Sequence, residues 1–520
     1  MSLIKSVATV GSLTFASRIL GFARDIVIAS VIGTGPVADA WAVAFRFPNL
    51  FRRLFAEGAF NSAFVPLYAR RLEGEGDASA TLFAEHILSV LLAILLAFSA
   101  IAIGAMPWIM IVYAPGFIDD PAKLSLAADF TQIAFPYLLF MSLCALYGGI
   151  LNSHGRFGWA AGVQALLNVG LLAALGIAHL IWRPALGASQ WGYALAIGCA
   201  GSGILQFVVL AFAAERHGWS LRLRLPEFGP DVSRLFRLAV PGIVSGGVSQ
   251  ISIFIATIVA SLQDGAPAIL YYADRIYQFP LGIVGVAMGI VLLPMLARHL
   301  RAGRDDLALH WQNRGLEVSM LLTLPASVAL MTISVPIAVA LFERGAFTRA
   351  DSVAVGTVLI AFGAGLPAFI LNKVLTPGFF AREDTATPMR FAVLTLLLDV
   401  ALSVGLFFLL GVIGIAIGTA VAAWANVALL WRTLASRGQF RLDDRVRDRL
   451  PRIVLASLGM GLILVGGTLA FASQLDAGAL TQALVLACLC AGGLIAYALL
   501  ALLLKATTIG ELRQQFSRGA

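Results

Sequence analysis

Long apolar runs recur along the whole of this chain and constrain its fold more than any other feature. The run "HILSVLLAILLAFSAIAIGAMPWIMIVY", which begins at His86, is long enough to cross a bilayer as a helix. Its residues do not alternate between apolar and polar, as the strands of a membrane β-barrel do. Only 12% of all residues are charged and the mean hydropathy is +0.90, which excludes an ordinary soluble protein. The sequence therefore predicts an all-α polytopic membrane protein.

Fourteen segments are predicted to be transmembrane helices, because each is apolar and long enough to span the hydrocarbon core. They cover residues 6–32, 37–69, 83–113, 125–152, 159–182, 190–214, 235–262, 267–297, 315–342, 352–381, 389–410, 413–434, 450–473 and 479–504. Since this number is even, both termini are expected on the same side of the membrane.

The distribution of lysine and arginine predicts which side that is. Loops on the side of the N-terminus, together with the two terminal segments, hold 25 of the 36 basic residues, and the opposite loops hold 4. Because positively charged loops stay in the cytoplasm, both termini are predicted to be cytoplasmic. Topology thus explains most of the net charge of +8, and nucleic-acid binding is not expected.

Weak similarity between two parts of the chain predicts an internal repeat. A Phe-Pro pair, followed by a second proline and then Ala-Arg, begins at Phe47 and again at Phe279. Asn168 and Asp399 match at nearly the same offset, although chance matching among apolar helices is the alternative. The repeat predicts two six-helix lobes of parallel topology. The predicted domains are an N-lobe over 1–214, a C-lobe over 233–434, and two further helices over 450–505.

Several basic residues lie inside the apolar segments, where topology does not account for them. These are Arg18, Arg24, Arg46, Arg52, Arg53, Arg275 and Lys373. A charge at the bilayer centre costs at least ~2.5–3.5 kcal/mol, so such side chains face a protein interior or a water-filled cavity. Helical spacing places Arg18 and Asp25 about 20° apart on one face, with Arg24 about 120° away from Arg18. The spacing predicts an Arg18–Asp25 pair that leaves Arg24 unneutralised.

The second apolar segment carries further charges. Arg53 and Glu57 are four residues apart and are predicted to pair. Snorkelling to the membrane interface is the alternative for Arg52 and Arg53. Arginine binds planar oxyanions through two parallel hydrogen bonds. Because the intramembrane cations outnumber the acids, the sequence predicts an anionic substrate, with interior salt bridges as the alternative interpretation.

Asp399, in "TLLLDVALSV", is a lone acid in the eleventh segment and a candidate for binding a coupling ion, Na⁺ or H⁺. A structural hydrogen-bonding role is the alternative, and Lys373 has the same ambiguity. No metal site is expected, because the six histidines are scattered and the four cysteines lie in apolar segments as packing residues. No motif of an NTPase, zinc protease or serine hydrolase occurs, so neither catalysis nor a cofactor is expected.

Four stretches carry a family resemblance: "SRILGFARDIVIA", "DAWAVAFRFPNLFRRLFAEGAFNSAFVP", "YYADRIYQFPLGIVGVAMGIVLLP" and "VLTPGFFAREDTATP". They resemble the MurJ (MviN) lipid II flippases of the MOP exporter superfamily, and the likeness covers essentially the whole chain. It implies two six-helix lobes around a cationic cavity, with the last two helices lining a groove for the lipid tail. It also implies transport of the undecaprenyl-pyrophosphate-linked disaccharide-pentapeptide from the cytoplasmic to the periplasmic leaflet of the bacterial inner membrane. Alternating access would drive this step of peptidoglycan synthesis.

The resemblance further implies site residues. The cavity arginines that would bind the pyrophosphate and head group match Arg18, Arg24, Arg52 and Arg275. The acids and neighbouring residues expected to hold these arginines or to form gates are Asp25, Asp39, Arg53, Glu57 and Gln278. Some members carry a glutamate where this chain has Gln278, which leaves the role of Gln278 open.

The expected partners are lipid II, membrane lipids and the cell-wall synthesis machinery, and a monomer is expected. The rival interpretation is another MOP transporter, either a polyprenyl-linked glycan flippase or a multidrug antiporter. An arginine-rich cavity disfavours an exporter of cationic drugs. The energy source, the order of lobe movements and the oligomeric state are not determined by the sequence.

Overall fold

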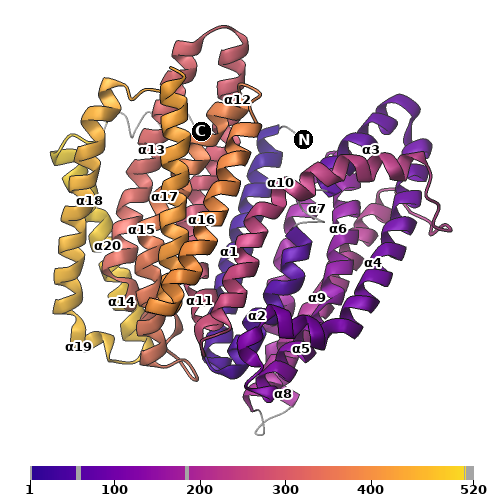
Figure 1. Ribbon diagram of the computed structural model, residues 1–520, viewed down its shortest axis with the longest axis horizontal. Helices are drawn as coiled ribbons and strands as arrows, with labels where there is room; N and C mark the ends of the chain where they lie inside the picture. Colours follow the sequence, from indigo (N-terminus) through magenta and orange to yellow (C-terminus); the bar gives the residue numbers. More distant parts are fainter. Residues whose placement is uncertain (1–2, 54–59, 182–186, 509, 511–520) are drawn as a thin grey trace. The chain divides into compact units, whose positions relative to one another are not determined.

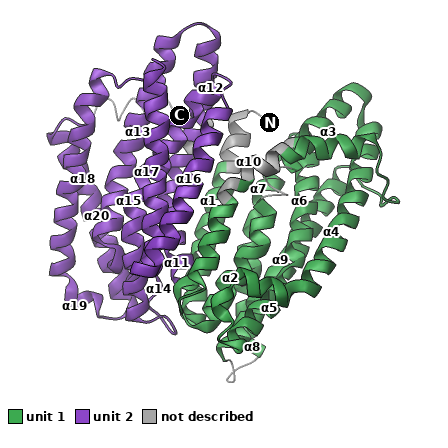
Figure 2. Cartoon of the chain, viewed as in Figure 1, with its two compact units in different colours: residues 1–268 green, residues 269–520 purple. Residues whose placement is uncertain are grey.

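The computed structural model describes residues 3–53, 60–181, 187–508 and 510, and all regular secondary structure within these ranges is helical (Figure 1). The predicted all-α class is therefore confirmed. By their internal contacts the residues form two compact units, 1–268 and 269–520, shown in green and purple in Figure 2. The first unit includes the helix that follows the residues predicted as the N-lobe. The internal repeat and its domain boundaries stay predictions.

Among its described residues, unit 1 contains ten α-helices, one short 3₁₀ turn and the start of an eleventh helix. In chain order they are α1 (Leu3–Ile32), α2 (Pro36–Phe51), α3 (Asn61–Glu75), α4 (Asp77–Tyr113), η2 (Pro115–Phe117), α5 (Pro121–Ala134), α6 (Pro136–Ser153), α7 (Phe157–Gly162), α8 (Gln164–Ile181), α9 (Ala188–Arg216), α10 (Pro230–Ala260) and α11 (Ala266–Pro280), which continues into unit 2.

The described part of unit 2 contains the rest of α11, a π-helical turn, eight further α-helices and one short connecting helix. These are η3 (Leu281–Gly285), α12 (Val286–Arg301), α13 (Asp305–Thr332), α14 (Ser334–Phe342), α15 (Arg349–Phe380), α16 (Ala386–Leu410), α17 (Val412–Ser436), α18 (Asp444–Ala470), α19 (Ala472–Leu475) and α20 (Ala479–Leu503).

Within the described ranges, ten helical segments are long and apolar enough to cross a membrane. They are α4, α5 with α6, α7 with α8, α9, α13, α15, α16, α17, α18 and α20. Many of their apolar side chains remain exposed in the structure, such as Ile101 at 71% and Leu462 at 76%. Such surfaces suit contact with lipid rather than water. A multi-pass membrane protein is thus confirmed, and the count of fourteen spans stays a prediction.

The position of α2 in unit 1 follows from its composition. The helix carries an unbroken buried stretch that includes Trp41, which is 1% exposed, and Phe45. A helix that is apolar on nearly all sides is stable only when neighbours cover it. Here α5 and α9 pack against it. The charged residue Asp39 is thereby placed deep inside unit 1.

In unit 2, α16 and α17 pack against each other. Gly411 turns the chain between them with a φ of +67°. A Cβ at Gly418 would lie 2.7 Å from the backbone nitrogen of Ser403, so only glycine permits this approach. The close packing brings Asp399 of α16 against α17.

The two C-terminal membrane helices pack on α13 and α14. Met460, Leu464 and Val485 belong to one shared apolar cluster, and the Tyr497 hydroxyl donates a hydrogen bond to the carbonyl of Leu321 at 2.7 Å. The helices α18 and α20 are therefore integral parts of unit 2. The lipid-tail groove expected along them stays a prediction.

Candidate functional site

Arg24 of α1 lies in the interior of unit 1 and is 4% exposed. Its Nε and Nη2 donate to Asp25 Oδ1 at 3.0 and 2.7 Å. Its Nη1 donates to Asn168 Oδ1 at 2.8 Å. The guanidinium also lies 5.6 Å from the centre of the Phe45 ring. Because the guanidinium of Arg24 donates to Asp25 on one side and to Asn168 on another, its position is fixed.

The partner of Asp25 differs from the predicted one. Helical spacing predicted Arg18, whereas the structure pairs Asp25 with its sequence neighbour Arg24. The helical angle describes only where each Cβ points, and the long arginine side chain reaches round the helix to the adjacent carboxylate. The predicted Arg18–Asp25 pair is therefore wrong, and Arg24 is the neutralised arginine of the two.

Asn168 of α8 holds α1 at two points. Its Oδ1 accepts the hydrogen bond from Arg24, and its Nδ2 donates to the carbonyl of Ser17 at 2.9 Å. The Asn168 amide packs close to Gly21, where a Cβ would lie 3.4 Å from it, in ordinary van der Waals contact. The sequence singled out Asn168 only as a repeat match, and its contact with α1 was missed.

Arg18 lines a separate cavity of unit 1, which we call the Arg18 cavity. Its volume is about 470 Å³, and its lining residues are Thr14, Ser17, Arg18, Asn152, Phe157, Ala160, Ala161 and Gln164. None of them is a carboxylate. Within the part of the chain that the structure describes, the Arg18 side chain forms no hydrogen bond or ion pair. Arg18 and Arg24 thus lie in chemically different surroundings.

Asp39 of α2 is 0% exposed and joins three segments of unit 1. Lys123 Nζ of α5 pairs with Asp39 Oδ2 at 2.7 Å. The backbone nitrogens of Gly265 and Ala268 donate to the same carboxylate at 2.8 and 3.1 Å. These amides lie at the start of α11, so the carboxylate satisfies N–H groups that have no partner within the helix. Lys123 also pairs with Asp264 at 2.9 Å.

Lys123 is a residue whose role the sequence did not indicate. It was counted among the cations of the outer loops, but it is 2% exposed and lies 4.4 Å from the centre of the Phe117 ring. The preceding Asp120-Pro121 is a typical helix start, and Asp120 caps the Lys123 backbone nitrogen. That signal places Lys123 on a helix. No signal in the sequence identifies Asp39 as its partner.

Arg52 and Arg53 directly follow the last residue of α2. Arg52 Nε donates to Asn49 Oδ1 at 3.0 Å, one turn earlier on the same helix. Arg53 is exposed, which agrees with the snorkelling alternative. Glu57 lies outside the described residues, so its predicted pairing with Arg53 stays a prediction.

In unit 2, α11 carries the second group of predicted site residues. The guanidinium of Arg275 lies 4.8 Å from the centre of the Tyr271 ring. Gln278, whose role the sequence left open, donates a hydrogen bond to Asp274. The π-helical turn η3 follows directly, and such turns are frequent at functional sites. The site roles of these residues stay predictions.

Asp399 of α16 is 8% exposed and lies beside the hydroxyl of Ser403. The Ser403 hydroxyl lies 3.1 Å from Asp399 Oδ1 and 3.3 Å from the carbonyl of Ile415. The Thr419 hydroxyl donates to the same carbonyl at 3.1 Å. Carboxylate, carbonyl and hydroxyl oxygens suit a hard cation and also a structural network. Both interpretations of Asp399 therefore stay open.

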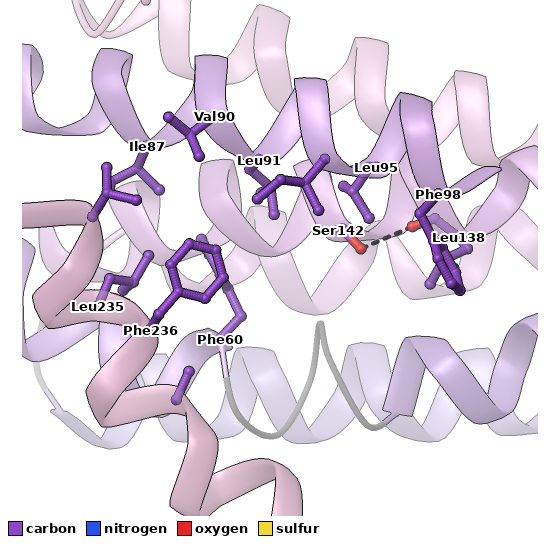
Figure 3. A pocket seen from close by; sticks show the side chains of 13 residues that line it. Phe60, Ile87, Val90, Leu91, Leu95, Phe98, Leu138, Ser142, Leu235 and Phe236 are labelled. Carbon is purple, nitrogen blue, oxygen red and sulfur yellow. Dashed lines mark hydrogen bonds between the residues drawn. The ribbon is translucent and has the colours of Figure 1, made fainter. Parts of the chain in front are cut away.

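A further cavity of unit 1, between α4, α6 and α10, is apolar (Figure 3). Its volume is about 220 Å³, and Leu91, Phe98 and Phe236 are among its lining residues. Among its described lining residues, Ser142 carries a hydroxyl, which donates to the carbonyl of Leu138 at 2.9 Å. None of these described residues is charged, so the part of the cavity that they form does not suit the charged part of a substrate.

Comparison with known proteins identifies the family of this chain. Residues 28–486 match the sequence model of the family described as "Lipid II flippase MurJ". The chain belongs to the MurJ family. A probable lipid II flippase MurJ of Rhizobium meliloti (strain 1021) is 44% identical over 100% of this chain and 97% of its own length. The lipid II flippase MurJ of Burkholderia cenocepacia is 34% identical over 90% of this chain and 89% of its own length.

Solved structures agree with the MurJ assignment. A structure described as "Lipid II flippase MurJ, inward closed conformation" is 25% identical, with a TM-score of 0.78 over 95% of this chain and 97% of its own. An inward-facing MATE multidrug transporter of the MOP superfamily matches with a TM-score of 0.67 at 16% identity, covering 83% of this chain and 98% of its own. The MATE likeness shows the shared fold alone. The predicted MurJ resemblance and the transporter assignment are confirmed, and the rival MOP functions gain no support.

Proposed function

We propose that this MurJ protein moves lipid II from the cytoplasmic to the periplasmic leaflet by alternating access. The cargo is the undecaprenyl-pyrophosphate-linked disaccharide-pentapeptide that peptidoglycan synthesis consumes. Its charged, sugar-bearing head group cannot cross hydrocarbon unaided, because burying unpaired charge is costly. The protein supplies a polar path across the membrane and performs no catalysis.

The observation that carries this proposal is a buried arginine on a helix of a MurJ chain. Arg24 is 4% exposed and contacts the carboxylate of Asp25 and the carboxamide of Asn168. Arginine is suited to phosphate, which accepts two parallel hydrogen bonds from its fork. In the proposed mechanism, Arg24, Arg18, Arg52 and Arg275 bind the pyrophosphate and the head group in the inward-open state. The prenyl tail stays in the lipid.

The acids hold the arginines and gate the path. Asp25 competes with the pyrophosphate for Arg24, so that substrate binding and release of Asp25 are coupled. Asp39 holds the start of α11 through its two amide contacts and Lys123. Gln278 with Asp274, and Arg53 with Glu57, complete the proposed set of supporting residues.

A coupling ion or the membrane potential supplies the energy in this proposal. Asp399 is the candidate ligand, since a carboxylate beside a hydroxyl suits Na⁺ or a proton. The protein works as a monomer in the bacterial inner membrane, with both termini in the cytoplasm. It delivers lipid II to the cell-wall synthesis machinery.

Depletion of the protein tests the proposed function. Lipid II is expected to accumulate in the cytoplasmic leaflet and to become inaccessible to a periplasmic probe of its head group. A normal rate of head-group exposure after depletion, in cells without another lipid II flippase, contradicts the proposal.

Substitution of Arg24 tests the residue assignment. Arg24→Ala is expected to abolish rescue of the depleted cells, although the variant still inserts in the membrane. Arg24→Lys is the matched variant: it keeps the charge but cannot bind Asp25 and Asn168 through a planar fork, so we expect partial rescue at best. Cell growth and membrane content of each variant are the measurements. Full rescue by Arg24→Ala would remove Arg24 from the substrate site.

A further inference from the structure

Another cavity of unit 1 lies between the first turns of α4 and the segment that follows α9, and we call it the Asp77 cavity. Its volume is about 480 Å³. Its described lining includes charged side chains of both signs and two hydroxyls, from Asp77, Glu85, Arg222, Arg224, Thr81 and Ser220. None of the arginines assigned to lipid II is among the described lining residues. The Asp77 cavity is therefore separate from the proposed substrate site.

The length of α4 places this cavity at a membrane surface. The 37 residues of α4 extend over about 55 Å, whereas the hydrocarbon core is only ~30 Å thick. Trp108, in the C-terminal part of α4, is 69% exposed, and exposed tryptophans gather where the membrane meets water. A span of about 20 residues from Trp108 toward the start of α4 reaches Leu88. Glu85 then lies at the level of the lipid head groups, and Asp77 lies farther from the hydrocarbon.

Two arginines form the positive end of the cavity. The backbone nitrogen of Arg222 donates to Glu85 Oε1 at 3.0 Å, and Arg224 Nε pairs with Glu85 Oε2 at 2.6 Å. Both oxygens of Glu85 are thus in use, while the side chain of Arg224 stays 45% exposed. The exposed guanidinium of Arg222 has no hydrogen-bonding or ionic partner in the part of the chain that the structure describes. This end of the cavity suits a phosphate, which accepts charge-assisted hydrogen bonds from guanidinium groups.

Asp77 forms the negative end of the cavity. It is the first residue of α4, and its side chain is 74% exposed. Its Oδ1 lies 3.4 Å from His154 Nε2. Asp77 and Glu85 are eight residues apart, which is about 12 Å along α4. Because each ion pair takes up about 3 Å of this length, a ligand that reaches both ends carries its anion and its cation about 5 Å apart.

Exposed leucines lie next to these charges. Leu82 of α4 lines the cavity, and Leu223 and Leu225 alternate with the two arginines along the chain. All three are exposed. Apolar side chains at a membrane surface are stabilised by contact with acyl chains, whereas contact with water is unfavourable. The surroundings of the cavity thus suit a ligand that joins a zwitterionic head to apolar chains.

We propose that the Asp77 cavity binds a membrane phospholipid whose head group is a phosphate with a primary ammonium, such as phosphatidylethanolamine. Arg222 and Arg224 bind the phosphate, and Asp77 accepts a hydrogen bond from the ammonium. The acyl chains lie against the exposed leucines. Hydrocarbon, phosphate and ammonium follow one another along α4 in the same order as within the lipid. The inference does not depend on lipid II, because it uses only the position of these residues at the membrane surface.

The test compares two lipids on the full-length protein in detergent. Phosphatidylethanolamine and phosphatidylcholine with identical acyl chains are titrated, and native mass spectrometry measures the dissociation constant of the first bound lipid. The two lipids share the phosphate, but the quaternary ammonium of phosphatidylcholine has no N–H to donate. We expect phosphatidylcholine to bind the wild-type protein about 3- to 5-fold more weakly. The factor is modest, because an ion pair with an exposed carboxylate contributes little.

Substitutions locate the discrimination between the two lipids. Asp77→Asn is expected to weaken binding of phosphatidylethanolamine to the level of phosphatidylcholine, so that the ratio of the two constants falls to about one. Arg222→Gln is expected to weaken both lipids by a similar factor and to keep the ratio, because both carry the phosphate. Asp119→Asn is the matched control, since Asp119 is an exposed acid in the turn after η2, beyond the other end of α4. It is expected to leave both constants unchanged.

Three results would overturn the proposal. The first is equal binding of the two lipids by the wild-type protein, and this comparison needs no variant that could misfold. The second is a preference for phosphatidylethanolamine that survives Asp77→Asn. The third is displacement of the bound lipid by an equal concentration of glycerophosphoethanolamine, which has the same head group without acyl chains. That displacement would assign the cavity to a soluble ligand rather than to a lipid.

Discussion

Asp39 illustrates how a fully buried carboxylate persists in a membrane-spanning chain. It is 0% exposed, and both of its oxygens are used by a lysine and two backbone amides. Its cation, Lys123, is 2% exposed and has the same need for a partner. Breaking a buried pair costs more than never having formed it, because one charge is left without compensation.

Removing Lys123 therefore destabilises unit 1. Lys123→Met is expected to lower the free energy of unfolding by about 3–5 kcal/mol, because Asp39 is left buried without its cation. The double variant Asp39→Asn, Lys123→Met is expected to recover part of this loss. Thermal unfolding of the purified protein in detergent measures both effects. Lys373→Met is the matched control, since Lys373 is an exposed lysine on an apolar helix. Equal stability of Lys123→Met and the control would contradict this account.

At the residue scale, the sequence predicted which side chains are buried charges better than it predicted their partners. Arg24 and Asp25 were recognised as interior charges because apolar segments surround them. Their pairing was missed, because helical angles do not describe the reach of an arginine side chain. The pair Lys123–Asp39 joins residues far apart in the chain, and one sequence without an alignment carries no signal of such a contact.

At the scale of elements, one buried glutamate attaches the C-terminal helices to the rest of unit 2. Glu317 of α13 pairs with Arg314 on its own helix and with Arg445 and Arg449 of α18, at 3.1 and 2.9 Å for the latter two. Asp443 caps α18 and also pairs with Arg314. This cluster holds the first turns of α18 against α13.

Glu317→Gln is expected to loosen the start of α18. Its arginine partners are partly exposed, so we expect a loss of only about 1–3 kcal/mol in the stability of this contact. The measurement is the rate of tryptic cleavage after the arginines of α18, which rises as the turn opens. Asp448→Asn on the same helix is the control, because Asp448 pairs with Arg452 at the surface. An unchanged cleavage rate in Glu317→Gln would exclude Glu317 as the attachment point.

The segment that leads from α9 to α10 is held in a different way. Its residues 219–229 have no regular secondary structure, so their backbone groups need partners elsewhere. The nitrogen of Arg222 donates to Glu85 at 3.0 Å, and that of Arg224 donates to the Ser89 hydroxyl at 2.9 Å. Both acceptors lie on α4, one turn apart. Side chains of α4 thus accept the backbone hydrogen bonds that a neighbouring strand accepts in a β-sheet.

Ser89→Ala is expected to release one of these contacts. The Arg224 amide loses its acceptor, and its hydrogen exchange is expected to become about 5- to 10-fold faster, as suits the loss of about 1 kcal/mol. Hydrogen-exchange mass spectrometry of the intact protein measures this. Ser99→Ala, also on α4, is the matched control, because the Ser99 hydroxyl is buried without a hydrogen-bond partner in the described chain. Equal exchange in the two variants would show that Ser89 does not hold the segment.

At the scale of the whole molecule, the sequence predicted the all-α fold class. It did not predict where the chain divides into its two compact units. The apolar runs determine the helices, since a lipid environment requires every backbone group to be paired within its own segment. The breaks within predicted segments were missed, for example at Ile333, which separates α13 from α14. Such breaks depend on neighbouring helices. The placement of α10 in unit 1 likewise results from contacts distant in the sequence.

The orientation in the membrane is the prediction that involves the whole chain. The asymmetry of 25 basic residues against 4 predicts that both termini are cytoplasmic. Two exposed serines lie on opposite sides under this prediction: Ser436 at the end of α17 and Ser473 on α19. In a background without the four native cysteines, Ser473→Cys is expected to react with a membrane-impermeant maleimide in intact cells. Ser436→Cys is expected to react only after permeabilisation.

Each labelling site is the control for the other, because the same reagent and the same substitution are used at Ser436 and Ser473. The exposure of Cys488 and Cys490 on α20 requires their removal first, whereas Cys144 and Cys199 are buried. Reversed labelling would place both termini outside the cytoplasm. It would also reverse the proposed direction of transport, because the mouth of the path that loads lipid II would then face the periplasm. Labelling therefore decides the direction of the path independently of any transport measurement.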